Sequence, residues 1–162
     1  LINAYKRVKT DKKLVIAGGS SHSDDYVKSL YKLVGIDKNI IFTGFVKGKE
    51  LEELYSNAYI YVLPSDSEGL PISLLEALSY GNCCLASDID EIYETMKEYG
   101  MYFKSGSEVI LSKVLEELLN DRTLVDSFKG KSKDFVQNEY NWSDKVADTL
   151  EVYNKCVNLT KE

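Results

Sequence analysis

The sequence is organised around one stretch, which reads Ser65-Asp66-Ser67-Glu68-Gly69-Leu70-Pro71-Ile72-Ser73-Leu74-Leu75-Glu76-Ala77-Leu78. The apolar run 59–63 precedes it and is followed by Pro64, which is typical of a buried parallel strand. Within the stretch, the apolar positions 72, 74, 75 and 78 repeat with helical spacing. We therefore predict a strand, a short polar loop and a helix.

Two glutamates in this stretch are candidates for binding a ligand. In open α/β sheets, ligands lie outside the carboxyl ends of strands, and the first turn of the following helix offers N–H groups to an anion. Glu68 lies in the predicted loop and Glu76 lies about two turns into the predicted helix, so they reach different parts of one elongated ligand. A carboxylate accepts hydrogen bonds from two neighbouring hydroxyls. This chemistry suits ribose or a hexose.

The spacing of Glu68 and Glu76 resembles the E-x7-E signature of the group 1 retaining glycosyltransferases of the GT-B fold. A pair of glutamates at this spacing is common in itself, but here it lies within Ser-Glu-Gly-Leu-Pro-x-x-Leu-Leu-Glu-Ala-Leu-x-x-Gly. The resemblance extends from Leu14 to about Val157. It includes the segments Leu-Val-Ile-Ala-Gly-Gly, Ile-Ile-Phe-Thr-Gly-Phe-Val, Leu-Tyr-Ser-Asn-Ala-Tyr-Ile-Tyr-Val-Leu-Pro-Ser, Leu-Ala-Ser-Asp-Ile and Tyr-Asn-Trp-Ser.

The resemblance implies roles for the residues of the central stretch. Glu76 would accept hydrogen bonds from the ribose, and Glu68 from the sugar that is transferred, which makes Glu68 the candidate catalytic residue. The backbone around Gly69, Leu70, Pro71 and Ile72 is the candidate phosphate site, because a helix N-terminus binds anions. Pro71 is favourable at the first helical position but has no N–H to donate. Ser65 is expected to cap this turn.

Two earlier loops are candidates for the rest of the donor site. The predicted strand 14–17 ends at Gly18 and Gly19, where glycine permits close approach of the backbone to a ligand. The predicted strand 40–43 leads into a loop whose backbone, in the family, pairs with the nucleotide base. The candidates there are Gly44, Phe45 and Val46. An ordinary turn remains the alternative for both loops.

An acidic motif, the histidine and an arginine are further candidates for contacts with a metal or a ligand. Asp88-Ile89-Asp90 matches the D-x-D metal motif of the other main glycosyltransferase fold, but it follows a short strand late in a Rossmann-like series, so no metal site is expected. The single histidine, His22, lies among polar neighbours and is expected to be solvated rather than a general base. In the family an Arg and a Lys before the first helix bind the diphosphate, and Arg7 lies too late in that helix to replace them with certainty.

Length and composition indicate one compact domain, residues 1–162, with a Rossmann-like, doubly wound and mostly parallel sheet. The net charge of -6 argues against a nucleic acid or an anionic membrane surface as partner. We expect a cytoplasmic domain without direct membrane contact, with the full-length protein at most peripheral at the inner face of the membrane. The three cysteines have no disulfide or zinc spacing and are expected to be buried or half-buried thiols.

The apolar positions of the last third of the chain recur with helical spacing, from Val109 to Phe128 and from Trp142 to Val157. We expect these stripes to belong to the core. In relatives the last helix leans towards the N-terminal domain, so that part of its apolar face, at Tyr153 or Val157, is expected to be exposed here.

The resemblance implies that this chain is the C-terminal, donor-binding half of a glycosyltransferase whose N-terminal acceptor domain is absent from it. Its ligand would be a nucleotide sugar, with a UDP-sugar favoured and no metal cofactor. The full enzyme would transfer a glycosyl group to an acceptor hydroxyl in bacterial polysaccharide or glycoconjugate synthesis. The fragment alone would bind the donor weakly and transfer nothing. A GT-B sugar-nucleotide epimerase, or a non-catalytic interaction module, remains an alternative.

Overall fold

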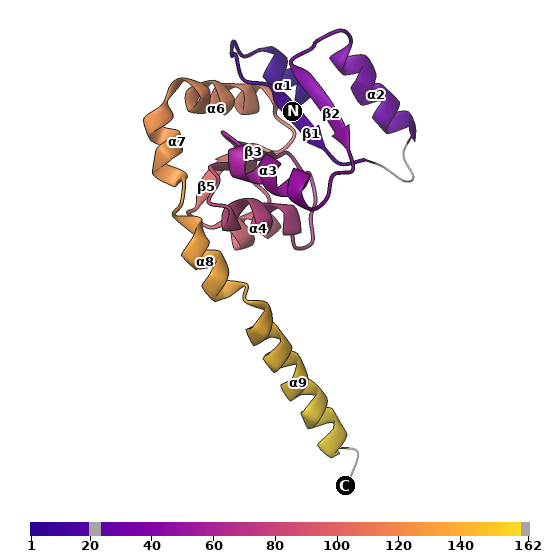
Figure 1. The fold of residues 1–162 in the computed structure, drawn as a ribbon, viewed down its shortest axis with the longest axis vertical. Coiled ribbons are helices and arrows are strands. Elements are labelled where there is room, and N and C mark those ends of the chain that lie inside the picture. Colours follow the sequence, from indigo (N-terminus) through magenta and orange to yellow (C-terminus); the bar gives the residue numbers. More distant parts are fainter. Residues whose placement is uncertain (20–23, 160–162) are drawn as a thin grey trace.

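The computed structural model describes residues 1–19 and 24–159, so His22 lies outside the described residues. Helices and strands alternate up to residue 103, and further helices then follow. Figure 1 labels them in chain order: α1 Ile2–Lys6, β1 Leu14–Ala17, α2 Asp24–Val34, β2 Ile40–Gly44, α3 Lys49–Asn57, β3 Tyr61–Leu63, α4 Ile72–Ser79, β4 Cys84–Ser87, α5 Asp90–Met96, β5 Gly100–Phe103, α6 Glu108–Asn120, α7 Arg122–Phe128, α8 Ser132–Glu139 and α9 Trp142–Leu159.

The five strands within the described residues pair with one another in parallel, which confirms the predicted α/β class. They form two sheets, one of β1 and β2 and one with the order β3-β4-β5. The central strand of the larger sheet, β4, is buried along its whole length, as expected for a parallel strand that is covered on both faces. The strand predicted at 59–63 is shorter than expected, because β3 begins only at Tyr61.

Side chains of β4 and the residue before it alternate between two cores, one on each face of the larger sheet. Cys83 and Leu85 pack with the buried face of α6, whereas Cys84 and Ala86 pack with α4 and α5. The predicted stripe on α6 is correct for Leu115 and Leu118, which are buried, but wrong for Val109 and Ile110, which are exposed. Leu111, which was not among the predicted positions, is buried as well. Val109 and Ile110 lie in the first turn of α6, on the side turned away from the sheet.

Among the described residues, helices cover one face of the smaller sheet and leave the other partly exposed. Leu14, Ile16, Ile40 and Phe42 face a core that α1 and α2 complete, while Val15 and Ile41, opposite one another in the register, are exposed. Helix α1 connects the two halves of the domain, because Ile2 belongs to this core and Ala4 to the core under α6.

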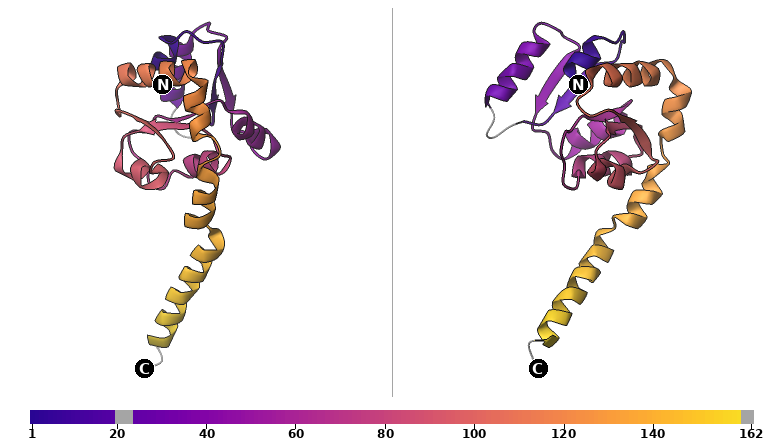
Figure 2. Two further views of the ribbon diagram at one scale, coloured as in Figure 1. Left: turned by 90° about the vertical axis from the view of Figure 1, so that its left-hand side faces the viewer. Right: turned by 180° about the vertical axis from the view of Figure 1, so that it is seen from behind.

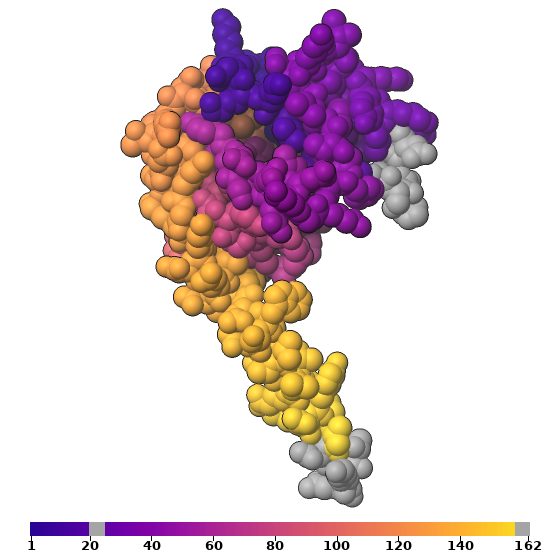
Figure 3. Space-filling model, in the orientation of Figure 1, coloured from indigo at the N-terminus to yellow at the C-terminus, as the bar shows by residue number. Residues whose placement is uncertain are grey.

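The last helices extend away from the sheets (Figures 1 and 2). Helix α8 still packs on α4, where the Ser132 hydroxyl donates to the carbonyl of Leu78 at 2.7 Å. Helix α9 projects as a narrow extension (Figure 3), and the prediction that its apolar stripe belongs to the core was wrong for Trp142, Val146 and Leu150, which are exposed. Tyr153 and Val157 are exposed, as expected for part of this face. Cys156, expected to be at least half-buried, is exposed because it lies on the same projecting helix. None of the described helices is both long and apolar enough to span a membrane.

Candidate functional site

The loop between β3 and α4 carries the first signature carboxylate. Glu68 is half-buried in this loop, and the Ser65 hydroxyl donates to its Oε1 at 2.5 Å. Ser65 was predicted to cap the turn, but its side chain binds the carboxylate instead. A charge-assisted hydrogen bond of this kind is short and holds the carboxylate in one orientation.

The second carboxylate, Glu76, lies on the exposed side of α4 and is bound by a residue from α3. The Tyr55 hydroxyl donates to Glu76 Oε2 at 2.9 Å and lies 3.3 Å from the carbonyl of Ser73. Burial and the hydrogen bond to Glu76 raise the pKa of Tyr55, so the phenol stays protonated and donates at neutral pH. Nothing in the sequence indicated this contact, because the helical spacing of α3 predicts only that Tyr55 faces the core.

A second phenol ties the start of α4 to the sheet. The Tyr61 hydroxyl donates to Ser73 Oγ at 2.9 Å, and burial raises the pKa of Tyr61 to about 12. The first turns of α4 are therefore attached to α3 through Tyr55 and to β3 through Tyr61.

The N-terminus of α4 is open to an anion. Pro71 is the N-cap, one residue earlier than predicted, and its carbonyl accepts from the N–H groups of Leu74 and Leu75 at 3.0 and 3.2 Å. No side chain caps this end of the helix, unlike α6 and α7, where Ser107 and Asp121 do so. The amides of Ile72 and Ser73 precede the first of these intrahelical bonds and are available to a ligand.

Around this N-terminus the loop is accessible. Gly69, Leu70 and Ile72 are exposed, so Ile72 does not contribute to the buried face of α4 although it is part of the apolar pattern of this helix. Leu74 and Leu78 carry the buried face of this helix instead.

The structure brings the other predicted residues together at the carboxyl ends of β1 and β2. The amide of Gly18 donates to the carbonyl of Gly44 at 2.8 Å, and both glycines have positive φ, 125° and 68°. A Cβ atom at Gly19 would lie 2.8 Å from Cε2 of Phe45, so the Phe45 ring packs directly on that backbone. The predicted site residues thus form two groups, one for each sheet.

The last of these predicted residues, Val46, lines a groove between β2 and α3. The groove has a volume of about 520 Å³, and its other lining residues are Thr43, Glu50, Glu53, Leu54 and Asn57. The two glutamates were not singled out from the sequence, since charged residues on the outer side of a helix are usually no more than solvated.

A polar network joins the loops that follow β3, β4 and β5. Ser105 donates from its amide to Asp88 Oδ1 at 2.7 Å and from its hydroxyl to Asp66 Oδ1 at 3.0 Å. The Ser105 amide, followed by Lys104 at 3.4 Å, lowers the pKa of Asp88. Asp88 is thus occupied by these two donors, and Asp90 begins α5. Within residues 1–19 and 24–159, no three His, Cys, Asp or Glu side chains gather in a metal-binding arrangement.

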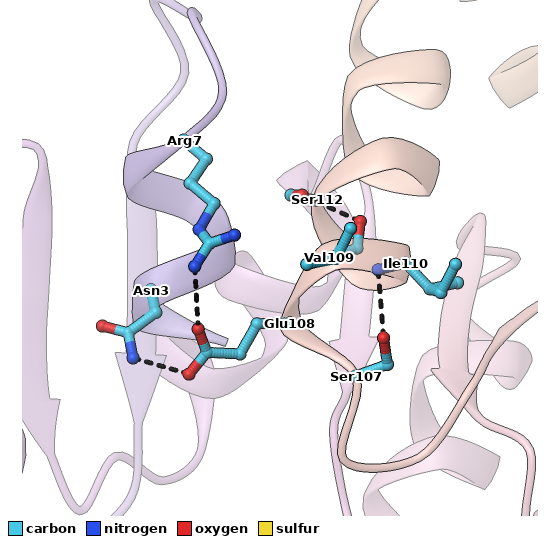
Figure 4. Close-up of polar contacts among 7 residues, drawn as sticks. All are labelled: Asn3, Arg7, Ser107, Glu108, Val109, Ile110 and Ser112. Atoms are coloured by element: carbon cyan, nitrogen blue, oxygen red, sulfur yellow. Dashed lines mark hydrogen bonds and ion pairs between the residues drawn. The ribbon is translucent and has the colours of Figure 1, made fainter.

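The arginines of the chain take part in ion pairs within the fold. Arg7 on α1 lies 3.3 Å from Glu108 Oε2, and Asn3 donates to the other carboxylate oxygen at 2.7 Å (Figure 4). These contacts attach α1 to α6. Arg122 pairs with Asp126 one turn along α7. Arg7 therefore has a structural partner on α6.

Comparison with known proteins supports the reading of the fold. Residues 1–142 match the model of the family described as glycosyl transferases group 1. An uncharacterized glycosyltransferase of Methanocaldococcus jannaschii is 29% identical over 157 residues, which are 94% of this chain and 40% of that protein. The alpha-galactosylglucosyldiacylglycerol synthase of Streptococcus pneumoniae is 30% identical over 138 residues, 85% of this chain and 36% of that protein.

Solved structures agree with the sequence relatives. HepE from Anabaena, solved in complex with UDP and glucose, superposes with a TM-score of 0.84 at 17% identity, over 93% of this chain and 43% of its own. Sucrose-phosphate synthase from Thermosynechococcus elongatus superposes with a TM-score of 0.85 at 19% identity, over 98% of this chain and 41% of its own. The fold is that of the Rossmann-like C-terminal domain of GT-B glycosyltransferases. The chain belongs to the group 1 glycosyltransferase family, and it spans about two fifths of the length of these relatives.

Proposed function

We propose that this chain binds the nucleotide-sugar donor of a retaining glycosyltransferase. The observation that carries the proposal is the arrangement around the N-terminus of α4. Glu68 precedes that terminus and Glu76 follows it, and each carboxylate is held by a hydroxyl from a neighbouring residue. The group therefore offers two fixed acceptors for sugar hydroxyls with helix N–H groups between them along the chain.

In this proposal each part of the donor has its own contact. Glu76 accepts hydrogen bonds from the ribose, and Glu68 accepts them from the sugar that is transferred. The diphosphate lies against the amides around Gly69, Leu70 and Ile72, where the helix dipole favours negative charge. Because these N–H groups offset charge on the departing diphosphate, the transfer is proposed to need no metal ion.

The base and the remaining phosphate contacts are assigned to the smaller sheet. The backbone of Gly44, Phe45 and Val46 is proposed to contact the base, and Gly18 with Gly19 to border the phosphates. The contacts between these two loops support the assignment, since they hold both backbones at the same edge of the sheet. A uridine donor is favoured, in line with the UDP bound to the related fold of HepE.

The full reaction is proposed to be transfer of a hexosyl group to an acceptor hydroxyl with retained anomeric configuration. The protein contributes positioning and charge stabilisation rather than a side-chain nucleophile. We place the enzyme in the cytoplasm or at the inner face of the membrane, in bacterial cell-surface polysaccharide or glycoconjugate synthesis. Since the acceptor would be bound by another domain, we expect the chain alone to bind the donor without transferring the sugar.

Ligand-observed NMR tests this function with UDP, GDP and ADP and their hexose conjugates at millimolar concentration. We expect a signal for one nucleotide family, with UDP favoured, that unlabelled competitor removes. A folded chain that gives no signal with any of these nucleotides contradicts the proposal. Detectable sugar transfer by the chain alone contradicts the further proposal that the chain binds the donor without transferring the sugar.

A further inference from the structure

We infer that Tyr55 is a positioning residue, which holds the Glu76 carboxylate in the orientation that receives the ribose hydroxyls. The inference rests on the proposed function, and it assigns a donor-site role to a residue of α3, outside the loop that carries the signature. Its basis is the hydrogen bond of 2.9 Å from the Tyr55 hydroxyl to Glu76 Oε2.

The surroundings of Tyr55 fix the phenol itself. Tyr55 is only 9% exposed, and its ring stacks on Tyr80 with ring centroids 5.4 Å apart and lies 6.1 Å from the ring of Tyr61. The hydroxyl also lies 3.3 Å from the carbonyl of Ser73, one turn before Glu76. The donor therefore comes from a rigid, packed side chain, while its acceptor lies on the exposed side of α4.

An exposed glutamate on a helix ordinarily samples many rotamers, and ordering such a side chain on binding reduces affinity. The contact with Tyr55 removes part of this cost before the ligand arrives. A carboxylate has about four acceptor positions, so one bond from the phenol leaves enough for two neighbouring ribose hydroxyls. The result is a carboxylate that is both oriented and still able to bind a diol.

A purely structural role for this hydroxyl makes a different prediction. The packing of the ring on Tyr80 and Tyr61 does not need the hydroxyl, so Tyr55→Phe keeps the core and removes only the bond to Glu76. If the hydroxyl served stability alone, its loss would lower the melting temperature and leave ribose recognition unchanged. If it positions Glu76, its loss changes how strongly the protein distinguishes ribose from deoxyribose.

The test is a set of NMR titrations of the chain with UDP and with 2′-deoxy-UDP. For Tyr55→Phe we expect UDP to bind about three- to tenfold more weakly, which is the range for one hydrogen bond. In the same variant, the ratio of the affinity for UDP to the affinity for 2′-deoxy-UDP should be smaller than in the wild type. Tyr80→Phe is the matched control, because it removes a neighbouring phenol hydroxyl from the same stack, and it should keep the wild-type affinities.

A double-mutant cycle with Glu76→Ala separates direct from indirect action. In the Glu76→Ala background, Tyr55→Phe should cause no further loss of UDP affinity. Wild-type affinity and ribose preference in Tyr55→Phe, or losses that add in the double mutant, overturn the inference while leaving the proposed function intact. A wild-type chain that binds neither nucleotide overturns the proposed function and, with it, the inference.

Discussion

The signature glutamates share one feature at the scale of single residues: each carboxylate is held by a hydroxyl donor. Ser65 holds Glu68 from within the same loop, and Tyr55 holds Glu76 from a neighbouring helix. The sequence indicated the two glutamates as candidates for binding sugar hydroxyls. It did not predict their donors, because a serine in the loop before a helix is usually a cap and a buried tyrosine on a helix is usually part of the core.

The contact of Ser65 with Glu68 leads to a test of the sugar subsite. In Ser65→Ala the Glu68 carboxylate loses its nearest donor, so a UDP-hexose should bind about threefold more weakly, which is the low end for one hydrogen bond. UDP, which lacks the sugar, should bind as before. Titration of both ligands by NMR gives the ratio of the affinity for the UDP-hexose to the affinity for UDP in each variant.

Ser67→Ala is the matched control for that test, because Ser67 lies in the same loop and is exposed. It should leave both affinities unchanged. If Ser65→Ala weakens UDP and the UDP-hexose equally, Ser65 supports the loop as a whole and not the sugar contact.

At the scale of elements, apolar runs and helical spacing predicted β1, β2 and α4 within a residue or two. The same reasoning did not identify α5 or α8. It also misjudged α9, since a stripe with helical spacing shows which side of a helix is apolar but not what covers that side. Coverage is a tertiary property, and α9 lies outside the packed part of the domain (Figure 1). The division into two sheets could not be predicted from the sequence either, because strands pair through backbone hydrogen bonds, which leave no pattern in the side chains.

The close approach of β5 to β4 gives a test of the larger sheet. A Cβ atom at Gly100 would lie 2.4 Å from Met96 Sδ and 2.7 Å from the carbonyl oxygen of Cys84. The carbonyl belongs to a fully buried strand and cannot move easily. Gly100→Ala should therefore lower the free energy of unfolding by about 1–3 kcal/mol, the usual range for overpacking.

Urea denaturation followed by circular dichroism measures that change. Gly69→Ala is the control for stability, because a Cβ there meets no atom within 4 Å and the backbone has no positive φ. Equal stability of Gly100→Ala and the wild type would mean that β5 does not pair as closely with β4 as described.

At the scale of the whole molecule, the buried thiols of the larger sheet couple stability to pH. Burial raises the pKa of Cys83 to about 11 from its ordinary 9.0, and burial also raises that of Cys84. The folded chain therefore keeps these protons at a pH where the unfolded chain loses them. The resulting contribution to stability is complete below pH 9 and is lost as the pH rises towards 11.

Unfolding in urea at pH 8, 9, 10 and 11 should accordingly give a free energy that falls steadily over the last three values. Cys83→Ala removes one of the titrating groups and should make the decline less steep, although a smaller side chain lowers stability at every pH. A free energy that stays constant or rises over this interval would contradict the burial of these thiols.

Accessibility gives a second whole-molecule test of the same thiols. Cys83 and Cys84 are buried, and Cys156 is exposed on α9. Iodoacetamide at pH 8 should therefore modify Cys156 in the native chain and all three cysteines in denaturant, with mass spectrometry identifying the sites. Rapid native labelling of Cys83 or Cys84 would mean that the sheet opens readily or is packed differently.

The central claim is that Glu76 and Glu68 bind different parts of one nucleotide sugar. Saturation-transfer NMR of UDP-glucose tests it most directly, because the signal of each ligand proton reports its own proximity to the protein. We predict that Glu76→Ala lowers the ribose signals more than the glucose signals, and that Glu68→Ala does the reverse. If the wild-type signals persist unchanged in both variants, or if both variants lose the same protons, the assignment of the two carboxylates is contradicted.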